Sequence, residues 1–432
     1  IHARSFEIAH AVMLTTGQGP IMAFQAGGPH AQDRALEAIA VAWKAMADVP
    51  PNATWEKPQG KNPPVVLNKR FEVVGRGIAL VIGCATFPTW NTYPGLFAAL
   101  ATGNPVIVKP HPNAVLPAAI TVSVLREVLA EQGLDANLVT LAVSPEPQLA
   151  QMLATHPMVA SIDYTGGNVF GRWLQTHATQ ARLYAEMAGV NVVVIESTDA
   201  YAAMLRNLAL SLSLFSGQMC TTTQNLLVPQ DGIQTDQGPK SFEQVGADLA
   251  QAIDQLLADP KVALTVLGAI GSAQTLERLA AAATLGRTVL ASRKLVHPEY
   301  PQAEVRTPAI VALDIADEQI YEQECFGPVS YLVAAPSRDA ARELAERSVR
   351  RHGAMTVGLY STDAAFTDSM VDACRRARVA LSINLTHSVM VNQSAGFSDF
   401  HATGGNPAAN AAYTTLAFVA DRFVVVQHRR HA

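Results

Sequence analysis

The chain has few cysteines and few charges for its length. Only 4 of its 432 residues are cysteine, and 16% are charged. The cysteines form no CxxC pair and have no zinc-like spacing with histidine, which argues against a disulfide framework and against a metal site. The net charge of −5, from 31 basic and 36 acidic residues, argues against a broad basic face for nucleic acid. We therefore expect a cytoplasmic protein with reduced thiols that needs no metal and binds no nucleic acid.

Long apolar runs are also missing. We find no stretch that reaches the ~18–20 apolar residues of a membrane span and no cleavable signal at the start, so we expect no membrane contact. The sequence begins at Ile1 and not at methionine, so we expect that the natural N-terminus lies upstream. A hydrophobic content of 49% over this length suffices for a large core and for two or three domains.

Strand-like and helix-like segments alternate through the first half of the chain. Residues 1–48 have helical spacing, the proline-rich residues 50–64 predict an irregular connector, and residues 65–74 predict an extended hairpin arm. The run Ile78–Ile82 is apolar throughout, as in a strand buried on both faces. This alternation predicts a doubly wound parallel sheet. Further strands are predicted at 105–108, 138–143, 161–164 and 191–195, and helices at 96–101 and 117–131.

A second α/β region follows. Ser241 and Gln244 form a capping-box pattern ahead of a predicted helix at 242–257. Ser337 can cap a predicted amphipathic helix at 338–348. The last predicted strand begins at Phe423 and could pair with a neighbouring element or with another subunit. The predicted strands of this half lie at 310–313, 329–333, 355–359 and 423–426.

Cys220 is the most informative single residue. It follows a helix-like run at 204–215, which Ser216 and Gly217 interrupt, and it precedes a strand-like run at 225–229. A thiol at such a junction can project from rigid elements into a cleft, as a nucleophile must. The alternative is a buried and inert cysteine.

Two polar side chains follow predicted strands of the first half. Asn91 could donate a hydrogen bond to a developing oxyanion, and the alternative is an Asx turn before Pro94. Lys109 ends the predicted strand at 105–108 and suits a ribose or a phosphate of a nucleotide. Its alternative is a solvated lysine at a strand end.

A glycine-rich turn lies between a predicted strand and a predicted helix at 164–171. Gly166, Gly167 and Gly171 could let the backbone approach a pyrophosphate, which the helix N-terminus attracts. The GxGxxG spacing is absent, so an ordinary turn is the alternative.

Two further segments carry a carboxylate. Small and apolar residues flank Glu186, an environment that raises a carboxyl pKa towards neutrality, so Glu186 could activate a water as general base. The alternative is a helix cap or a paired surface glutamate. Glu324 could accept hydrogen bonds from ribose hydroxyls, and Phe326 could pack on a nicotinamide. The competing interpretation of this pair is a turn before the strand at 329–333.

These segments, in this order and at these separations, resemble the aldehyde dehydrogenase superfamily from about residue 73 onwards. The motifs at 87–91, 109–112 and 217–222 are most similar to the phenylacetic acid degradation protein PaaN branch. The resemblance implies that the Cys220 thiol attacks an aldehyde and that Asn91, with the Cys220 backbone N–H, holds the oxyanion. It implies that Glu186 activates the water that releases the acid. The implied cofactor positions are Trp90, Lys109, Gly166, Gly167, Gly171, Glu324 and Phe326.

The resemblance also implies the architecture. We expect a Rossmann-type dinucleotide-binding domain at 1–187 that includes an arm at 62–77. A second α/β domain at 188–405 would carry catalysis, and residues 406–432 would form a C-terminal return with an oligomerisation strand. We expect a homodimer or a homotetramer.

The chain departs from the family's usual residues in ways that affect the cofactor. Pro112 stands three residues after Lys109, where NAD-preferring members often carry a glutamate that binds the adenosine ribose. Without that carboxylate a 2′-phosphate meets less repulsion, so we expect NADP to be favoured, with NAD possible. The other departures are at Gly167, Ala188, Val190 and Thr222.

Several alternatives stay open for the substrate and the reaction. Relatives that release an acyl-CoA generally lack the general base, so Glu186 favours a free acid, with a CoA-acylating reaction as the alternative. The branch resemblance implies a CoA-linked semialdehyde from phenylacetate catabolism. A non-catalytic member would have lost the thiol, the amide or the base. A thiol hydrolase would need a histidine partner, which no recognisable motif provides. Residues 388–395 are expected to line the substrate entrance.

Overall fold

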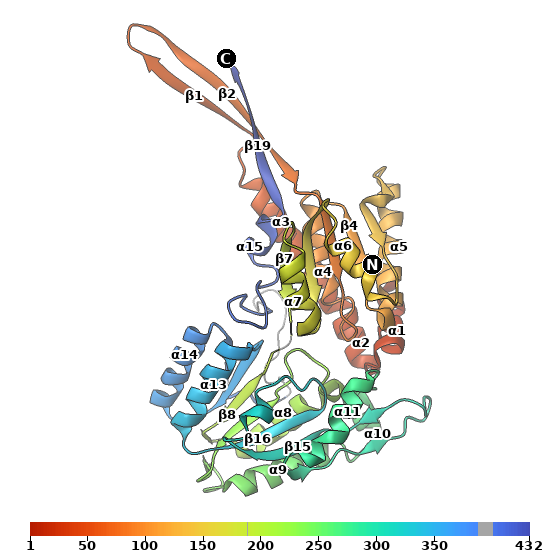
Figure 1. The fold of residues 1–432 in the computed structure, drawn as a ribbon, viewed down its shortest axis with the longest axis vertical. Helices are drawn as coiled ribbons and strands as arrows, with labels where there is room; N and C mark the ends of the chain where they lie inside the picture. The colour runs from red at the N-terminus through yellow and green to blue at the C-terminus, as the bar shows by residue number, and fades with distance from the viewer. Residues whose placement is uncertain (188, 388–400) are drawn as a thin grey trace.

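The computed structural model describes residues 1–187, 189–387 and 401–432. The expected entrance segment at 388–395 and the departure at Ala188 lie outside the described residues. The described chain is elongated (Figure 1). A three-stranded arm projects from one end, a unit around a five-stranded sheet lies in the middle, and a unit around a seven-stranded sheet forms the other end.

The five-stranded sheet is parallel throughout, with the strand order β5-β4-β3-β6-β7. Its chain order reverses between β3 and β6, so the carboxyl ends of these two strands form the crevice where open α/β sheets bind ligands. The predicted doubly wound sheet is therefore confirmed. The strands are β3 (Ile78–Ile82), β4 (Val106–Lys109), β5 (Val139–Leu141), β6 (Val159–Thr165) and β7 (Arg182–Glu186).

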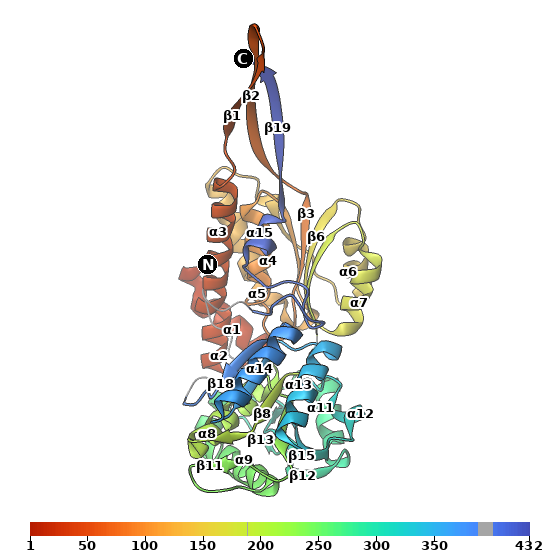
Figure 2. The same ribbon diagram turned by 90° about the vertical axis from the view of Figure 1, so that its left-hand side faces the viewer.

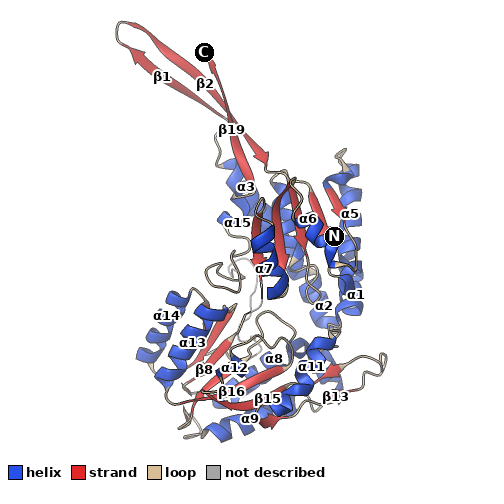
Figure 3. Cartoon of the chain, in the orientation of Figure 1, coloured by secondary structure: helices blue, strands red, loops and turns tan. Residues whose placement is uncertain are grey.

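Helices cover both faces of this sheet (Figures 2 and 3). Successive side chains of a strand point to opposite faces. Ala79 and Val81 of β3 accordingly pack with α3, α4 and α5, whereas Leu80 and Ile82 pack with α6 and α7. The helices are α1 (Ser5–Thr16), α2 (Pro20–Gly27), α3 (Pro29–Ala47), α4 (Thr92–Ala101), α5 (Val115–Glu131), α6 (Pro147–Ala154) and α7 (Asn168–His177).

Residues Pro112–Glu131, which include α5, are long and apolar enough by length and composition alone to cross a membrane. This finding corrects the expectation that no stretch has that character. Composition alone is a weak indication, because the core helix of a soluble protein has the same properties. Ala118 and Val122 of α5 pack in the core with β3 and β4, and Ile120 packs against α1.

The seven-stranded sheet has the order β12-β15-β16-β10-β8-β17-β18, and β12 at one edge is antiparallel to its neighbour. One face packs against α8 and α9, and the other against α13 and α14. The strand predicted at 191–195 belongs to this sheet and not to the first. The strands are β8 (Val192–Ile195), β10 (Asn225–Pro229), β12 (Arg287–Leu290), β15 (Ala309–Asp314), β16 (Val329–Ala335), β17 (Thr356–Tyr360) and β18 (Ala380–Ile383).

Two helices of this unit, α9 and α13, start where the sequence predicts. The Ser241 hydroxyl accepts from the Gln244 N–H, and the Gln244 side chain accepts from the Ser241 N–H, so the capping box is confirmed. Ser337 caps α13 through the Ala340 N–H. The helices are α8 (Tyr201–Ser213), α9 (Phe242–Leu256), α10 (Pro260–Val266), α11 (Ala273–Ala281), α12 (Glu318–Tyr321), α13 (Arg338–His352) and α14 (Ala364–Ala377). Short paired strands are β9 (Ser197–Thr198), β11 (Gln234–Thr235), β13 (Lys294–Leu295) and β14 (Val305–Arg306).

The arm consists of β1 (Asn52–Gln59), β2 (Asn62–Gly75) and β19 (Phe423–His431), which are antiparallel. It is longer than predicted, because the segment expected to be an irregular connector forms β1. Pro58 is compatible with this strand because β1 lies at the sheet edge and its register shifts between Lys57 and Gln59. The C-terminal strand pairs with β2 of its own chain, as one of the two predicted options stated.

The C-terminal segment returns from the second unit to the first. It includes α15 (Leu416–Ala420). Arg422 donates two hydrogen bonds to the Asp163 carboxylate of β6, at 2.6 and 2.8 Å, and both side chains are buried. This buried ion pair joins the end of the chain to the first sheet. The domain boundaries at 187 and 405 stay predictions.

Candidate active site

One cavity of about 800 Å³ lies at the carboxyl ends of β3 and β6 and is lined by residues of both units. This is the crevice that the strand order predicts. Trp90 and Gly171 are not among its lining residues. The lining residues that the sequence had marked are Asn91, Lys109, Gly166, Gly167, Glu186, Cys220, Glu324 and Phe326.

Cys220 follows a turn with an unusual backbone. Phe215 and Ser216 have φ angles of 51° and 49°, in the left-handed region that costs a residue with a side chain about 1–3 kcal/mol. The Ser216 hydroxyl holds the turn, since it is 2.9 Å from the carbonyl oxygens of Gly268 and Arg306. The surrounding chain thus determines the direction in which Cys220 leaves the turn.

Asn191 holds the loop that carries Cys220, which we call the nucleophile loop. Its Nδ2 donates to the carbonyl oxygens of Cys220 at 2.8 Å and Thr222 at 3.0 Å. Its Oδ1 accepts from the backbone N–H of Met355 at 3.0 Å. Because Asn191 directly precedes β8, the loop is tied to a strand in the interior of the seven-stranded sheet.

Glu186 ends β7 and is 1% exposed. Its Oε2 lies 3.1 Å from His401 Nε2 and accepts from Asn91 Nδ2 at 3.3 Å. Burial alone would raise the pKa of this carboxyl, but His401, the Cys220 thiol and Arg34 outweigh burial, so the pKa lies below its ordinary value. The expected upward shift is therefore wrong, because these partners come from distant segments. The carboxyl is ionised at neutral pH and can accept a proton.

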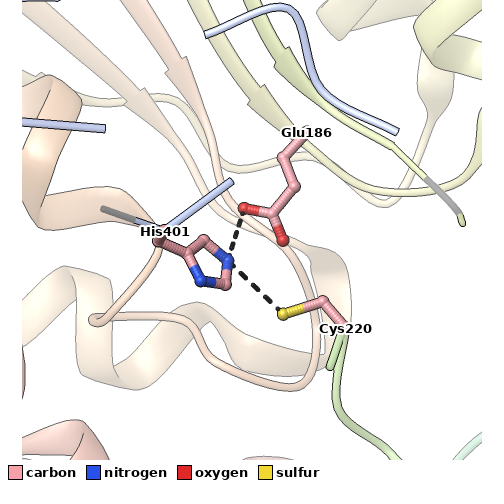
Figure 4. Close-up of side chains that lie close together, drawn as sticks. All are labelled: Glu186, Cys220 and His401. Carbon is pink, nitrogen blue, oxygen red and sulfur yellow. Dashed lines mark hydrogen bonds and ion pairs between the residues drawn. The ribbon is translucent and has the colours of Figure 1, made fainter. Parts of the chain in front are cut away.

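His401 is the site residue that the sequence did not reveal. Its Nε2 lies 3.5 Å from Cys220 Sγ and 3.1 Å from Glu186 Oε2 (Figure 4). The three donor atoms all lie within 4.8 Å of one another, and His401 is 2% exposed. The sequence shows no recognisable motif that pairs a histidine with Cys220, but the fold brings His401 to it. No local signal could have found it, because 181 residues separate the two side chains.

Asn91 precedes α4 but its side chain makes no capping bond to that helix. The amide instead faces the reaction site. Nδ2 points to Glu186, and Oδ1 lies 3.4 Å from Cys84 Sγ. The structure therefore does not support the Asx-turn alternative. Its role as an oxyanion donor stays a prediction, which its place in the cavity with Cys220 favours.

Lys109 ends β4 and is 5% exposed, so it is not the solvated lysine of the alternative interpretation. Its Nζ donates to the carbonyl oxygens of Pro110 at 3.1 Å and Ser144 at 3.3 Å. Burial lowers the pKa of this amine. Pro112 lines the same cavity.

The start of α7 forms an open cradle. Gly167 precedes the helix without a side-chain cap, so the first N–H groups stay available to an anion. A Cβ on Gly167 would meet nothing within 4 Å, whereas one on Gly166 would lie 2.5 Å from the Tyr164 hydroxyl oxygen. This space fits the pyrophosphate of a dinucleotide. Gly171 serves packing, because a Cβ there would lie 2.4 Å from Met187 Sδ.

Glu324 and Phe326 line the cavity from the second unit. Burial raises the pKa of Glu324 to about 7, although Arg278 and the Gly189 N–H oppose this shift. Arg278 donates to the Phe326 carbonyl oxygen at 2.9 Å and so supports this loop. The Glu324 carboxyl can therefore change its charge near neutral pH.

Trp90 packs away from the cavity lining. Its ring meets the His401 ring edge-on, with centroids 4.5 Å apart, and the Arg34 guanidinium lies 4.5 Å from the Trp90 ring centroid. These contacts link Trp90 to His401. The expected role of Trp90 in cofactor binding stays a prediction.

Comparisons with known proteins agree with this geometry. Residues 18–414 match the aldehyde dehydrogenase family. The crystal structure of an NAD-dependent aldehyde dehydrogenase from Burkholderia multivorans is 54% identical, with a TM-score of 0.97, over 99% of this chain and 77% of that chain. The fold alone is shared with an NADP-dependent glyceraldehyde-3-phosphate dehydrogenase from Bacillus halodurans C-125, complexed with NADP, at 16% identity and a TM-score of 0.73, over 100% of this chain and 84% of that one.

Curated relatives match over a shorter range. The alpha-ketoglutaric semialdehyde dehydrogenase 2 of Azospirillum brasilense is 28% identical over 287 residues, which are 64% of this chain and 52% of that protein. The chain spans 52–60% of the length of the first curated relatives that it matches. The match over residues 18–414, which is most of the chain, shows that the chain belongs to the aldehyde dehydrogenase family.

Proposed function

We propose that the protein oxidises an aldehyde to a carboxylic acid, with a nicotinamide dinucleotide as hydride acceptor. The observation that carries this proposal is the shared cavity. Cys220, Asn91 and Glu186 line one part of it, and Lys109 and the uncapped start of α7 line another. A thiol nucleophile, an amide donor and a carboxylate base beside an anion cradle are the groups that thiol-dependent aldehyde oxidation requires.

The residues of the chain account for each proton and bond. The Cys220 thiolate attacks the aldehyde carbon, so a C–S bond forms and the carbonyl electron pair moves to oxygen. Asn91 Nδ2 and the Cys220 backbone N–H donate to that oxygen. When bound, the dinucleotide supplies the acceptor for the hydride, which leaves a thioester on Cys220. Glu186 then takes a proton from a water whose oxygen attacks the thioester, and the C–S bond breaks to release the acid.

The direct test is an aldehyde panel assayed with NAD and with NADP. We expect dinucleotide reduction in equal amount to the acid formed, and a loss of at least about 1,000-fold in the Cys220→Ala variant. Turnover that survives in Cys220→Ala would contradict the proposal. No turnover with any aldehyde would favour the alternative of a non-catalytic family member.

The state of Glu186 supports hydrolysis over CoA acylation. The carboxyl is ionised, and its Oε1 has no hydrogen-bond partner among the described residues, so this oxygen can accept from a water. Assays with and without added CoA separate the two reactions by mass spectrometry. A new acyl-CoA in place of the carboxylate would contradict the proposal.

NADP is the proposed cofactor preference, with NAD possible. Pro112 lines the cavity at the position where many NAD-preferring relatives carry a ribose-binding glutamate. Without that carboxylate a 2′-phosphate meets less repulsion, and the nearby Lys109 could pair with it. The 54% identical relative from Burkholderia multivorans is NAD-dependent, which supports the other choice. The ratio of kcat/KM for the two dinucleotides decides the question, and a value well above one for NAD over NADP would contradict the preference.

The proposed substrate is a CoA-linked semialdehyde from phenylacetate catabolism, supported by the motif resemblance to the PaaN branch. We also propose a cytoplasmic location and a homodimer or homotetramer, for which the projecting arm provides exposed strands. Turnover of CoA-linked and free semialdehydes tests the first point, and light scattering tests the oligomer. No step of the proposed reaction requires a metal ion, and that expectation stays a prediction.

A further inference from the structure

We propose that His401 is a further catalytic residue, whose Nε2 lies between the Cys220 sulfur and the Glu186 carboxylate and takes the thiol proton as the sulfur attacks the aldehyde. The inference rests on the proposed function and assigns a third group to its reaction site. It starts from one geometric fact: the same ring nitrogen faces both acidic side chains, at 3.5 and 3.1 Å (Figure 4).

Two adjacent anions at this site would be costly. Glu186 is 1% exposed and His401 is 2% exposed, so water screens a thiolate beside this carboxylate less than it would at the surface. Burial and the neighbouring Glu186 raise the pKa of the Cys220 thiol well above its ordinary value. A nucleophile in this environment needs a positive partner within hydrogen-bonding distance. Among the described residues, His401 is the basic side chain that contacts both groups.

Neighbouring residues fix the orientation of the His401 imidazole. Trp90 meets the ring edge-on at 4.5 Å, and Tyr413 stacks against it with centroids 6.2 Å apart. The His401 carbonyl oxygen accepts from the Tyr413 N–H at 3.3 Å. Aromatic packing on the ring and a backbone bond behind it keep Nε2 directed at the two acids, as a preorganised group requires.

The proton balance is simple. In the neutral form the proton is on Cys220 Sγ, and in the ionised form the S–H bond has broken and the proton is on His401 Nε2. The imidazolium then donates towards the thiolate and the Glu186 carboxylate, and attack on the aldehyde consumes the sulfur lone pair and not the proton. When water cleaves the thioester, the thiolate leaves towards the same imidazolium. His401 therefore assists both formation and loss of the C–S bond.

Other ionisable groups face this proton from each neighbouring element, so a pH profile reports the whole cluster. They are Cys84 after β3, Glu186 on β7, Cys220 in the nucleophile loop, Tyr413 in the C-terminal segment and Arg34 on α3.

The test measures Cys220 without aldehyde and without dinucleotide. Iodoacetamide alkylation of Cys220 is followed by peptide mass spectrometry from about pH 6 to about pH 9, in the native protein and in His401→Gln. We expect the variant's rate at neutral pH to fall by at least about tenfold and its profile to shift by at least about one pH unit towards higher pH. An identical profile in the two proteins would overturn the proposal.

A control variant and a second measurement accompany this test. His428→Gln is the matched control, since His428 is exposed on β19 of the arm, and its profile should equal that of the native protein. If His401→Gln does not fold, His401→Asn in the same alkylation assay still decides. We expect the same fall in the Cys220 alkylation rate at neutral pH. An unchanged rate would overturn the role of His401, whereas absence of dehydrogenase activity would overturn the proposed function alone.

Discussion

The cavity has a part around Cys220, which we call the reaction part, and a part at the start of α7, which we call the dinucleotide part. Side chains form the first, whereas backbone forms the second. The reaction part is a set of side chains that contact one another and come from distant segments, namely the buried Asn91, Glu186 and His401 and the half-buried Cys220. In the dinucleotide part, the backbone turn before α7 leaves open space at Gly167, and the described residues place no side-chain cap there. Chemistry at one carbon atom requires converging side chains, whereas an anion needs free N–H groups and room. A substitution should therefore damage one part and spare the other.

Glu186→Gln should have the largest effect, which should fall on the reaction part and spare the dinucleotide part. The amide cannot take a proton from water, so we expect kcat to fall by about 10²–10⁴-fold while dinucleotide KM stays within about twofold. Rapid mixing should show a burst of about one reduced dinucleotide per site before the slow phase, because thioester formation does not need this base. A variant with no burst and a normal steady rate would show that Glu186 does not activate water.

Pro112→Glu should change the dinucleotide part alone. A carboxylate at this position would repel a 2′-phosphate and accept from a ribose hydroxyl, so the ratio of kcat/KM for NADP over NAD should fall by about tenfold or more. The alkylation rate of Cys220 serves as the internal control and should not change. An unchanged ratio would show that the 2′-phosphate does not bind near Pro112.

Glu324→Gln should remove a pH dependence of dinucleotide binding. Burial raises the pKa of Glu324 to about 7, so the carboxyl is protonated below that pH and ionised above it. A carboxylate accepts from ribose hydroxyls better than a carboxylic acid does, so native KM should fall by about two- to fivefold as pH rises through 7. The variant should show a flat profile over the same range. The same pH slope in both proteins would remove Glu324 from the cofactor site.

Gly167→Ala should have the smallest effect. A Cβ there meets nothing within 4 Å and the backbone angles suit alanine, so Tm should stay the same within about 1 °C. If a pyrophosphate occupies that space, dinucleotide KM should rise by about two- to fivefold. Gly166→Ala is the matched comparison, because its Cβ would lie 2.5 Å from the Tyr164 hydroxyl oxygen and should lower Tm. Equal Tm losses in both variants would contradict the open cradle.

Local patterns predicted those elements whose own residues decide their structure. Ile78–Ile82 is apolar at every position, and Ser241 with Gln244 carries its own capping chemistry, so both were predictable. β7 was missed because it is a short edge strand whose first residue, Arg182, is exposed. β1 was missed because Pro58 and the prolines that flank the strand suggest a connector, whereas pairing with β2 along the arm determines that it is a strand.

The sequence by itself determined the family and marked Cys220 and the glycine turn as candidates, because these depend on residue types at fixed local spacings. The tertiary structure alone decided that His401 contacts Cys220 and that the pKa of Glu186 falls. It also decided that Trp90 packs on His401. The physical reason is that charge and burial act through space. A carboxyl whose sequence neighbours are apolar is stabilised as an anion once the fold brings a histidine within 3.1 Å of it.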